Sequence, residues 1–181
     1  MSFPRKQLTD REIEDYVQRS QQGPCFVCQI VRGEAEYQHH MIHEDDQAIV
    51  FLNMHQPLYG YTLVAPRQHR EHVTADFTPE EYLSLQRLVY SVGQAVQRAV
   101  PTERLYVLSL GSQQGNRHVH WHIAPLPSGV PYSQQQLWAL NHGNGILDMS
   151  EEEKASLAQR IKQELSSDQR SDQDATRSFR P

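Results

Sequence analysis

The chain lacks most of the features that mark membrane, secreted and duplex-binding proteins. No apolar run approaches the roughly 20 residues that a membrane-spanning helix needs, and the N-terminal segment has no apolar core of the secretory-signal kind. Two cysteines are too few for a disulfide-stapled scaffold, and 17 basic against 22 acidic residues leave no positive surplus for duplex nucleic acid. The 181 residues, 38% of them hydrophobic, therefore predict a soluble, cytoplasmic protein with one domain and no membrane or duplex nucleic-acid partner.

Periodic patterns divide the chain into four parts. We expect an N-terminal helical segment over residues 1–24, the main domain over 25–126, a helical extension over 127–166 and a disordered tail over 167–181. The expected elements are helices over residues 9–22, 79–100 and 150–165 and strands over residues 48–52, 61–65, 104–110 and 118–124. This order predicts an α+β fold, with an antiparallel sheet, one long helix packed on it and a helical C-terminal extension.

Three histidines alternate with apolar residues in the segment HVHWHIA, residues 118–124. In a strand, side chains alternate between the two faces, so His118, His120 and His122 should project from one face while the apolar residues anchor the other. The three imidazoles would then lie about 6–7 Å apart along the strand.

Three interpretations fit such a histidine face. It can be a solvated polar face without chemistry, or a metal site, since imidazoles two positions apart on a strand can share one ion. It can also be a nucleophilic site, because imidazole titrates near pH 6.5 and a neutral ring attacks an electrophile while its neighbours donate hydrogen bonds to developing charge.

The segment HVHWHIA also resembles the signature of the histidine triad (HIT) superfamily, in which three histidines alternate with apolar residues. The upstream segments HEDDQAIVFLN and GYTLVAPRQH follow the family's order, and the resemblance covers residues 25–125. It implies a nucleotide hydrolase or nucleotidyl transferase that acts on a substrate such as a purine nucleoside phosphate conjugate. The central histidine, His120, would attack the α-phosphorus and form a nucleotidyl-histidine, with His118 and His122 as further catalytic residues. HIT domains commonly pair, so a homodimer is expected.

Two further positions carry over from the family pattern as substrate-binding candidates. Asn53 stands where many members have an Asp that binds the ribose hydroxyls, and an amide offers both a donor and an acceptor. Gln114 stands four residues before the first triad histidine, where many members have a Gln that touches phosphate; a simple turn residue is the alternative.

The sequence departs from the family in two places. Tyr61 replaces the histidine that is common in the family's Gly-His-x-Leu-Val segment. The loop at residues 110–117 lacks the Asn-x-Gly that usually helps to bind phosphate, and Ser109 or Ser112 is a candidate substitute. We expect the histidines outside the triad and the metal cluster to lie on the surface or in loops. For His142 and Trp138 the alternative is that they cover the site, although a surface histidine and a packing aromatic are favoured.

The Cys25-x-x-Cys28 pair admits three interpretations on its own: a redox pair, two inert thiols, or half of a zinc site that needs two more ligands. A thioredoxin-like redox pair is expected within a βαβ unit, and the sequence does not predict such a unit around these cysteines. The resemblance implies a structural Zn²⁺ site, completed by His69 and His118, which ties the N-terminal segment to the catalytic residues.

Three alternatives to a general nucleotide hydrolase or transferase stay open. One is a phosphorylase or hydrolase of diadenosine polyphosphates, which the family pattern around residues 52–53 and 64–66 favours. Another is a nucleotide-binding sensor or scaffold without turnover. The last is a zinc-dependent hydrolase with the ion in the triad, in which chelation would abolish catalysis at once.

Overall fold

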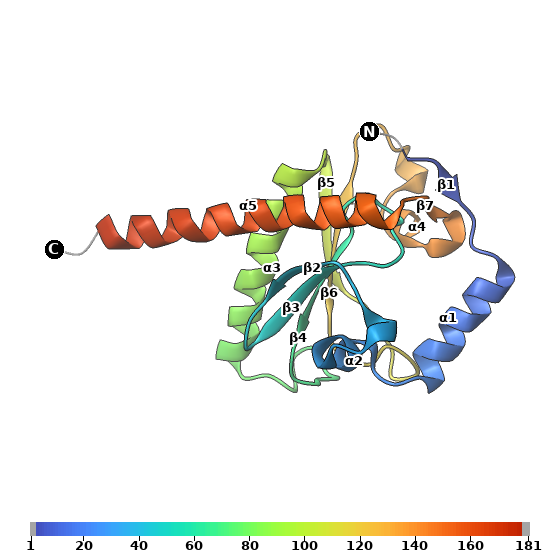
Figure 1. The fold of residues 1–181 in the computed structure, drawn as a ribbon, viewed down its shortest axis with the longest axis horizontal. Coiled ribbons are helices and arrows are strands. Elements are labelled where there is room, and N and C mark those ends of the chain that lie inside the picture. Colours follow the sequence, from blue (N-terminus) through green and yellow to red (C-terminus); the bar gives the residue numbers. More distant parts are fainter. Residues whose placement is uncertain (1–2, 179–181) are drawn as a thin grey trace.

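A five-stranded antiparallel sheet forms the centre of the computed structural model, which describes residues 3–178 and, of their side chains, those up to residue 167. The strand order is β2-β3-β4-β6-β5 (Figure 1). The bounds are β2 Met41–Glu44, β3 Ala48–Leu52, β4 Thr62–Pro66, β5 Arg104–Ser109 and β6 Trp121–Leu126. The predicted α+β fold with an antiparallel sheet is confirmed, and the pairs β3–β4 and β5–β6 are both antiparallel.

Strand β6 begins later than the histidine pattern predicts. It starts at Trp121, so His118 and His120 precede the strand and only His122 lies within it. The reason lies in the backbone hydrogen bonds, because the amide of Val119 donates to the Arg70 carbonyl at 2.7 Å instead of joining the ladder. The prediction of three histidines on one strand is therefore wrong.

The two faces of the sheet pack against different helices. Alternate residues of β3, such as Val50, face the core shared with α3 (Pro79–Ala99) and α5 (Glu151–Ser178). The intervening residues, such as Phe51, face α2 (Phe26–Arg32). Helix α3, predicted over residues 79–100, buries one apolar side, with Leu85, Val89, Val92 and Val96 among its buried residues. This leaves the α2 face of the sheet as the one that carries the pocket described below.

Helix α1 (Asp10–Gln22) is confirmed. It begins with a capping box, in which the Thr9 side chain caps the first turn and the Thr9 amide donates to the Glu12 carboxylate at 2.7 Å. None of its residues is buried. Strand β1 (Arg5–Lys6), before α1, pairs with β7 (Ile146–Leu147) in a second, two-stranded sheet. The N-terminal segment is thus fastened to the C-terminal extension.

The extension between the two sheets consists of short helical turns. They are η2 Tyr132–Gln134, α4 Leu137–Leu140 and η3 His142–Asn144. Ala139 and Leu140 of α4 pack in a small apolar cluster with Tyr61 and Leu126. This contact places the extension next to β4 and β6, at the end of the sheet where the pocket opens.

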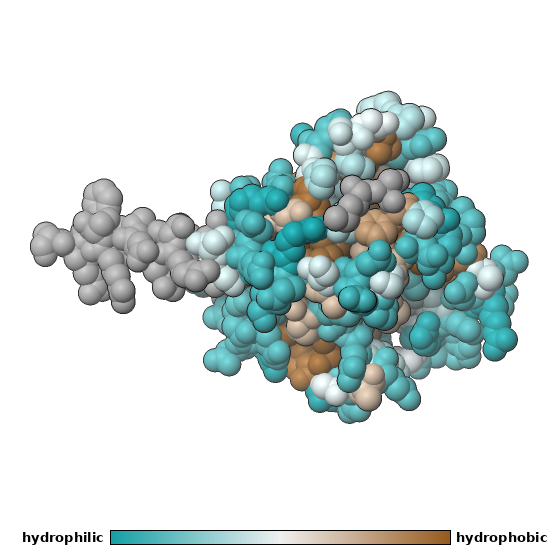
Figure 2. Space-filling model, turned by 45° about the horizontal axis from the view of Figure 1, so that its top comes forward, coloured by the Kyte–Doolittle hydropathy of each residue, from teal (hydrophilic) through white to brown (hydrophobic). Residues whose placement is uncertain are grey.

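Helix α5 continues beyond its predicted end near Leu165 and runs to Ser178, so it passes through most of the segment that we expected to be disordered (Figure 1). No glycine or proline interrupts residues 151–178, and nothing local stops the helix. Residues 179–181 of the predicted tail lie outside the described residues. Hydrophilic residues cover most of the face seen in Figure 2, with apolar residues in separate small patches. Within residues 3–178, no helix combines the length and apolarity that crossing a membrane requires.

Candidate active site and metal centre

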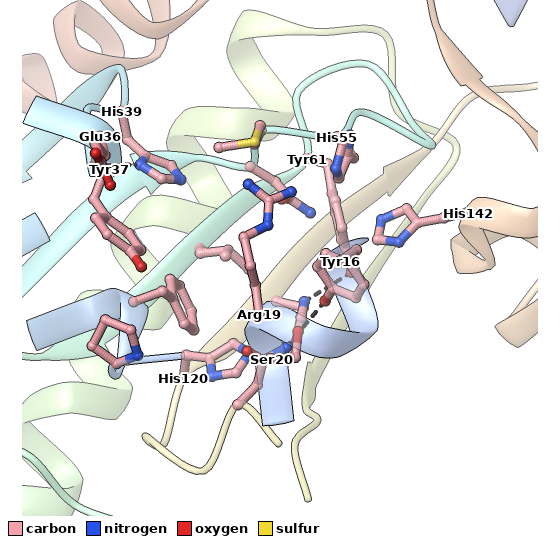
Figure 3. Close-up of a pocket in the computed structure, with 17 residues that line it drawn as sticks. Tyr16, Arg19, Ser20, Glu36, Tyr37, His39, His55, Tyr61, His120 and His142 are labelled. Carbon is pink, nitrogen blue, oxygen red and sulfur yellow. Dashed lines mark hydrogen bonds between the residues drawn. The ribbon is translucent and has the colours of Figure 1, made fainter. Parts of the chain in front are cut away.

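His120 lies at the wall of a pocket and is held there by the backbone of His118. Its Nδ1 is 2.7 Å from the His118 carbonyl oxygen, which can only accept a hydrogen bond, so the proton of the neutral ring is on Nδ1. The Ser109 hydroxyl donates to the His120 carbonyl at 2.8 Å and fixes the backbone from the other side. Although the side chain is only 4% exposed, it lines a cavity of about 210 Å³ (Figure 3). The ring therefore offers an unprotonated Nε2 at this wall.

His122 is hydrogen-bonded to Tyr61. The Tyr61 hydroxyl lies 2.8 Å from Nδ1 of His122, and burial raises the pKa of Tyr61 far above its usual value, so the phenol stays protonated. A protonated phenol can donate to Nδ1 or accept from it, and when it donates, the proton of the neutral His122 ring is on Nε2. Nε2 is a buried atom that has no hydrogen-bond partner among the described residues. The rings of His120 and His122 are 4.7 Å apart, so the two imidazoles stand side by side in one pocket.

Five histidines line the pocket, and burial is the main cause that lowers the pKa of each. The pKa falls to about 4 for His55 and to about 3 for His122. It falls in the same direction for His39, His120 and His142. Since these rings are uncharged at neutral pH, Arg19 is the one cationic side chain among the residues that line the pocket.

A second cluster lies behind His120, on the other side of the triad backbone. It brings together Cys25 and Cys28 of the α2 turn, His69 of the loop after β4, and His118, whose ligand atoms all lie within 4.8 Å of one another. The Sγ–Nδ1 distances are 3.4 Å for Cys25 to His118, 3.7 Å for Cys28 to His118 and 3.4 Å for Cys28 to His69.

This donor set fits a tetrahedral metal ion. With metal–sulfur bonds of about 2.3 Å and metal–nitrogen bonds of about 2.0–2.1 Å, a tetrahedral site holds its S and N ligands about 3.5 Å apart. The remaining nitrogens of both rings are held by acceptors, the Pro66 carbonyl 2.9 Å from His118 Nε2 and the Glu71 carboxylate 3.0 Å from His69 Nε2. Such outer bonds leave the Nδ1 lone pairs directed at the cysteines, as in histidines that ligate metals. The four residues can therefore bind a metal.

The structure brings some of the predicted site residues together and separates others. Asn53 lines the pocket with His120 and His122. His118 does not line it, because both of its ring nitrogens are engaged in the metal cluster and with Pro66. Gln114 and Ser112 lie exposed in the loop before the triad, and neither lines the pocket. This loop places Asn116 at the pocket instead.

Several pocket residues are not predicted from the sequence. Helix α1 contributes Tyr16, Arg19 and Ser20, and His39 and His55, expected on the surface or in loops, line the pocket (Figure 3). His142 also lines it, so the alternative that His142 lies at the site is the correct one. No motif marks them, since they come from segments without a family signature. The one available signal was the spacing of Tyr16, Arg19 and Ser20, which places them on one side of a helix.

The fold is that of the histidine triad class, as the resemblance implies. Residues 34–128 match the HIT domain family, and the chain belongs to this family. An uncharacterised HIT-like protein of Saccharolobus solfataricus is 30% identical over 113 residues, which are 59% of this chain and 77% of that protein. The protein named Hit of Bacillus subtilis is 28% identical over 104 residues, 56% of this chain and 70% of that protein.

Two solved structures show the same fold. A hypothetical histidine triad nucleotide-binding protein from Sulfolobus tokodaii superposes with a TM-score of 0.63 at 22% identity, over 79% of this chain and 93% of that one. A zinc-bound histidine triad family protein from Mycobacterium smegmatis gives a TM-score of 0.64 at 18% identity, over 81% of this chain and 96% of that one.

Proposed function

We propose that the protein is a nucleotide hydrolase or nucleotidyl transferase that cleaves at the α-phosphate of a nucleoside conjugate through a covalent nucleotidyl-histidine on His120. The observation that carries this proposal is the hydrogen bond of 2.7 Å from His120 Nδ1 to the His118 carbonyl. It leaves a nucleophilic nitrogen at the wall of a pocket, next to His122, whose buried Nε2 has no hydrogen-bond partner among the described residues.

In the first step, the Nε2 lone pair of His120 forms a bond to the α-phosphorus as the bond from phosphorus to the leaving group breaks. The leaving group takes the electron pair of the broken bond. The His120 ring becomes positively charged, and the His118 carbonyl stabilises that charge through the Nδ1 proton. Water or inorganic phosphate then attacks the phosphorus, displaces Nε2 and returns the ring to its neutral form.

The neighbouring residues have separate roles in this reaction. The Nε2–H group of His122 donates to a phosphate oxygen or to the leaving atom, where preorganised donors stabilise developing charge. Asn53 at the pocket wall binds the ribose hydroxyls through its amide. These roles are assigned from position and tautomer, and each can be tested by substitution.

For the metal cluster, the proposed ion is Zn²⁺, held by Cys25, Cys28, His69 and His118. Two sulfur and two nitrogen donors in a closed set are typical of structural zinc, which stabilises a fold without reacting. The ion would join α2, the loop after β4 and the segment before His120, and so support the backbone that orients the nucleophile. A zinc ion within the triad is not favoured, because His118 Nδ1 faces the cysteines while His120 Nδ1 faces a carbonyl.

One experiment separates an enzyme from a sensor. The protein is incubated with adenosine 5′-phosphoramidate, diadenosine tetraphosphate and a nucleotide sugar, with and without phosphate, and the products are identified by mass spectrometry. His120→Ala should abolish turnover and retain nucleotide binding, whereas His72→Ala, at an exposed histidine, should change neither. Binding without turnover in the unchanged protein would establish the sensor. The homodimer and the cytoplasmic location stay predictions.

A further inference from the structure

Helix α1 turns one side toward the pocket although none of its residues is buried. Tyr16, Arg19 and Ser20 are spaced by three and four positions, share that side and all line the cavity. The helix belongs to the part of the chain that precedes the HIT domain match at residue 34. Burial of an apolar stripe therefore does not explain why α1 lies where it does.

Polar contacts at both ends hold α1 over the pocket. At its start, β1 pairs with β7 of the C-terminal extension. At its end, the Asn116 amide donates to the Ser20 carbonyl at 3.2 Å, and the Asn116 side chain donates to the Tyr16 hydroxyl at 3.0 Å. Asn116 belongs to the loop that precedes the triad, so its two hydrogen bonds connect α1 directly to the candidate active site.

The pocket has two unlike ends in Figure 3. Glu36, Tyr37 and His39 lie at one end, while His55 and His142 lie at the other, with Tyr16 beside them. The rings of His55 and His142 are 5.5 Å apart, and each lies about 6 Å from the Tyr16 ring, at 6.1 and 6.2 Å.

Two cations, Arg19 and Lys154, and one anion, Glu12, act on the His55–His142 end. The side chain of Arg19 extends from α1 into the cavity between the two ends (Figure 3). Besides burial and His142, the cations Arg19 and Lys154 lower the pKa of His55, which Glu12 opposes more weakly. Nε2 of His142, like Nε2 of His122, is buried and has no hydrogen-bond partner among the described residues.

We propose that Arg19, His55, His142 and Tyr16 form a subsite for an anionic leaving group, so that the substrates are nucleotides joined to a further phosphate rather than nucleoside phosphoramidates. This inference rests on the proposed function and names its substrate class. A polyphosphate leaving group carries several negative charges, and the planar guanidinium of Arg19 can bind two phosphate oxygens at once. An amine leaving group offers no anion for Arg19 to bind.

For diadenosine tetraphosphate, the bonds that form and break and the resulting products are as follows. The His120 Nε2–phosphorus bond forms while the bond from the α-phosphorus to its bridging oxygen breaks, and that oxygen takes the electron pair. ATP is the leaving group, and the Arg19 subsite binds this anion. Water then releases AMP from His120, so one water molecule is consumed for one AMP and one ATP.

The test compares two substrates in the complete chain. For Arg19→Gln, the loss of kcat/KM on diadenosine tetraphosphate should exceed the loss on adenosine 5′-phosphoramidate by about 10- to 100-fold, the range of a charge-assisted hydrogen bond. Arg19→Lys keeps the positive charge but lacks the planar guanidinium that binds two oxygens. It should therefore lose less activity on diadenosine tetraphosphate than Arg19→Gln does. Arg11→Gln on the same helix is the control, since its side chain is 90% exposed. Equal losses on both substrates, or no loss, would overturn the subsite.

A binding experiment separates failure of the subsite from failure of the proposed function. If the unchanged protein turns over neither substrate, the proposed function fails, and calorimetry with AMP and ATP still tests the subsite. Arg19→Gln should then weaken the binding of ATP more than that of AMP by a similar factor. Unaltered relative affinities would overturn the subsite independently of catalysis.

Discussion

The hydroxyl oxygen of Tyr61 lies 2.8 Å from Nδ1 of His122, and the two rings stack with an interplanar angle of 24°. Tyrosine stands here where the family pattern has a histidine. Because the pKa of Tyr61 is raised by burial, the phenol stays protonated at neutral pH and can donate to Nδ1. In the proposed mechanism it does so, which holds the His122 proton on Nε2.

Tyr61→Phe keeps the stacked ring and removes this donor. The His122 proton can then move to Nδ1, which deprives the pocket of its N–H group, and kcat should fall about 10-fold or more with little change in KM. Nitrogen-15 spectra of the imidazole rings check the cause, since the His122 tautomer should change in this variant. Tyr90→Phe, at a side chain that is 68% exposed, is the control. An unchanged tautomer would contradict the assignment.

The sequence predicts those parts of the site that depend on local pattern. Capping residues, apolar periodicity and alternation identify α1, α3 and the paired strands, because each signal acts within one element. The family motif identifies His120, and the Cys25-x-x-Cys28 pair with His69 and His118 proves to be one cluster. In both cases the motif itself fixes which residues meet.

The sequence does not predict contacts between distant segments that lack a motif. His142 reaches the pocket because α4 packs on Tyr61 and Leu126, and Arg19 reaches it because the chain is fastened at β1 and at Asn116. Alternation at residues 118–124 indicates a strand, but it does not show whether a neighbouring strand can pair with the whole segment, and the strand begins only at Trp121. Tertiary hydrogen bonds decide these points.

Cys28→Ser tests the metal cluster. The unchanged protein should contain about one zinc ion per chain, and the variant should lose it, because a hydroxyl is a poor zinc ligand. The loss should lower Tm by about 5 °C or more, since three segments meet at the site. Metal content is read by elemental mass spectrometry and Tm by calorimetry, with His72→Ala as the control. Chelation should reduce turnover only as the fold loosens, and immediate loss at a temperature at which the fold persists would support a catalytic ion instead.

Ile161→Ala tests whether α5 is part of the core. Ile161 is fully buried against the α3 side of the sheet, so removing its side chain leaves a cavity and should lower the free energy of unfolding by about 2–5 kcal/mol. Urea denaturation of this variant is compared with that of Lys162→Ala, one position further along α5 at an exposed residue. Equal midpoints for the two variants would show that α5 adds nothing to stability.

The lowered pKa of His55 predicts how stability depends on pH. In the folded protein the ring protonates only near pH 4, whereas in the unfolded chain it protonates near 6.5. Between these values the unfolded state binds more protons, so the free energy of unfolding should fall as pH decreases from about 7 to about 4, and His55 adds nothing further below that. His55→Gln should reduce the slope by up to one proton. The slope is measured by urea denaturation at a series of pH values, with His72→Gln as the exposed control. If His55→Gln kept the slope of the unchanged protein, the burial that lowers the pKa of His55 would lose its support.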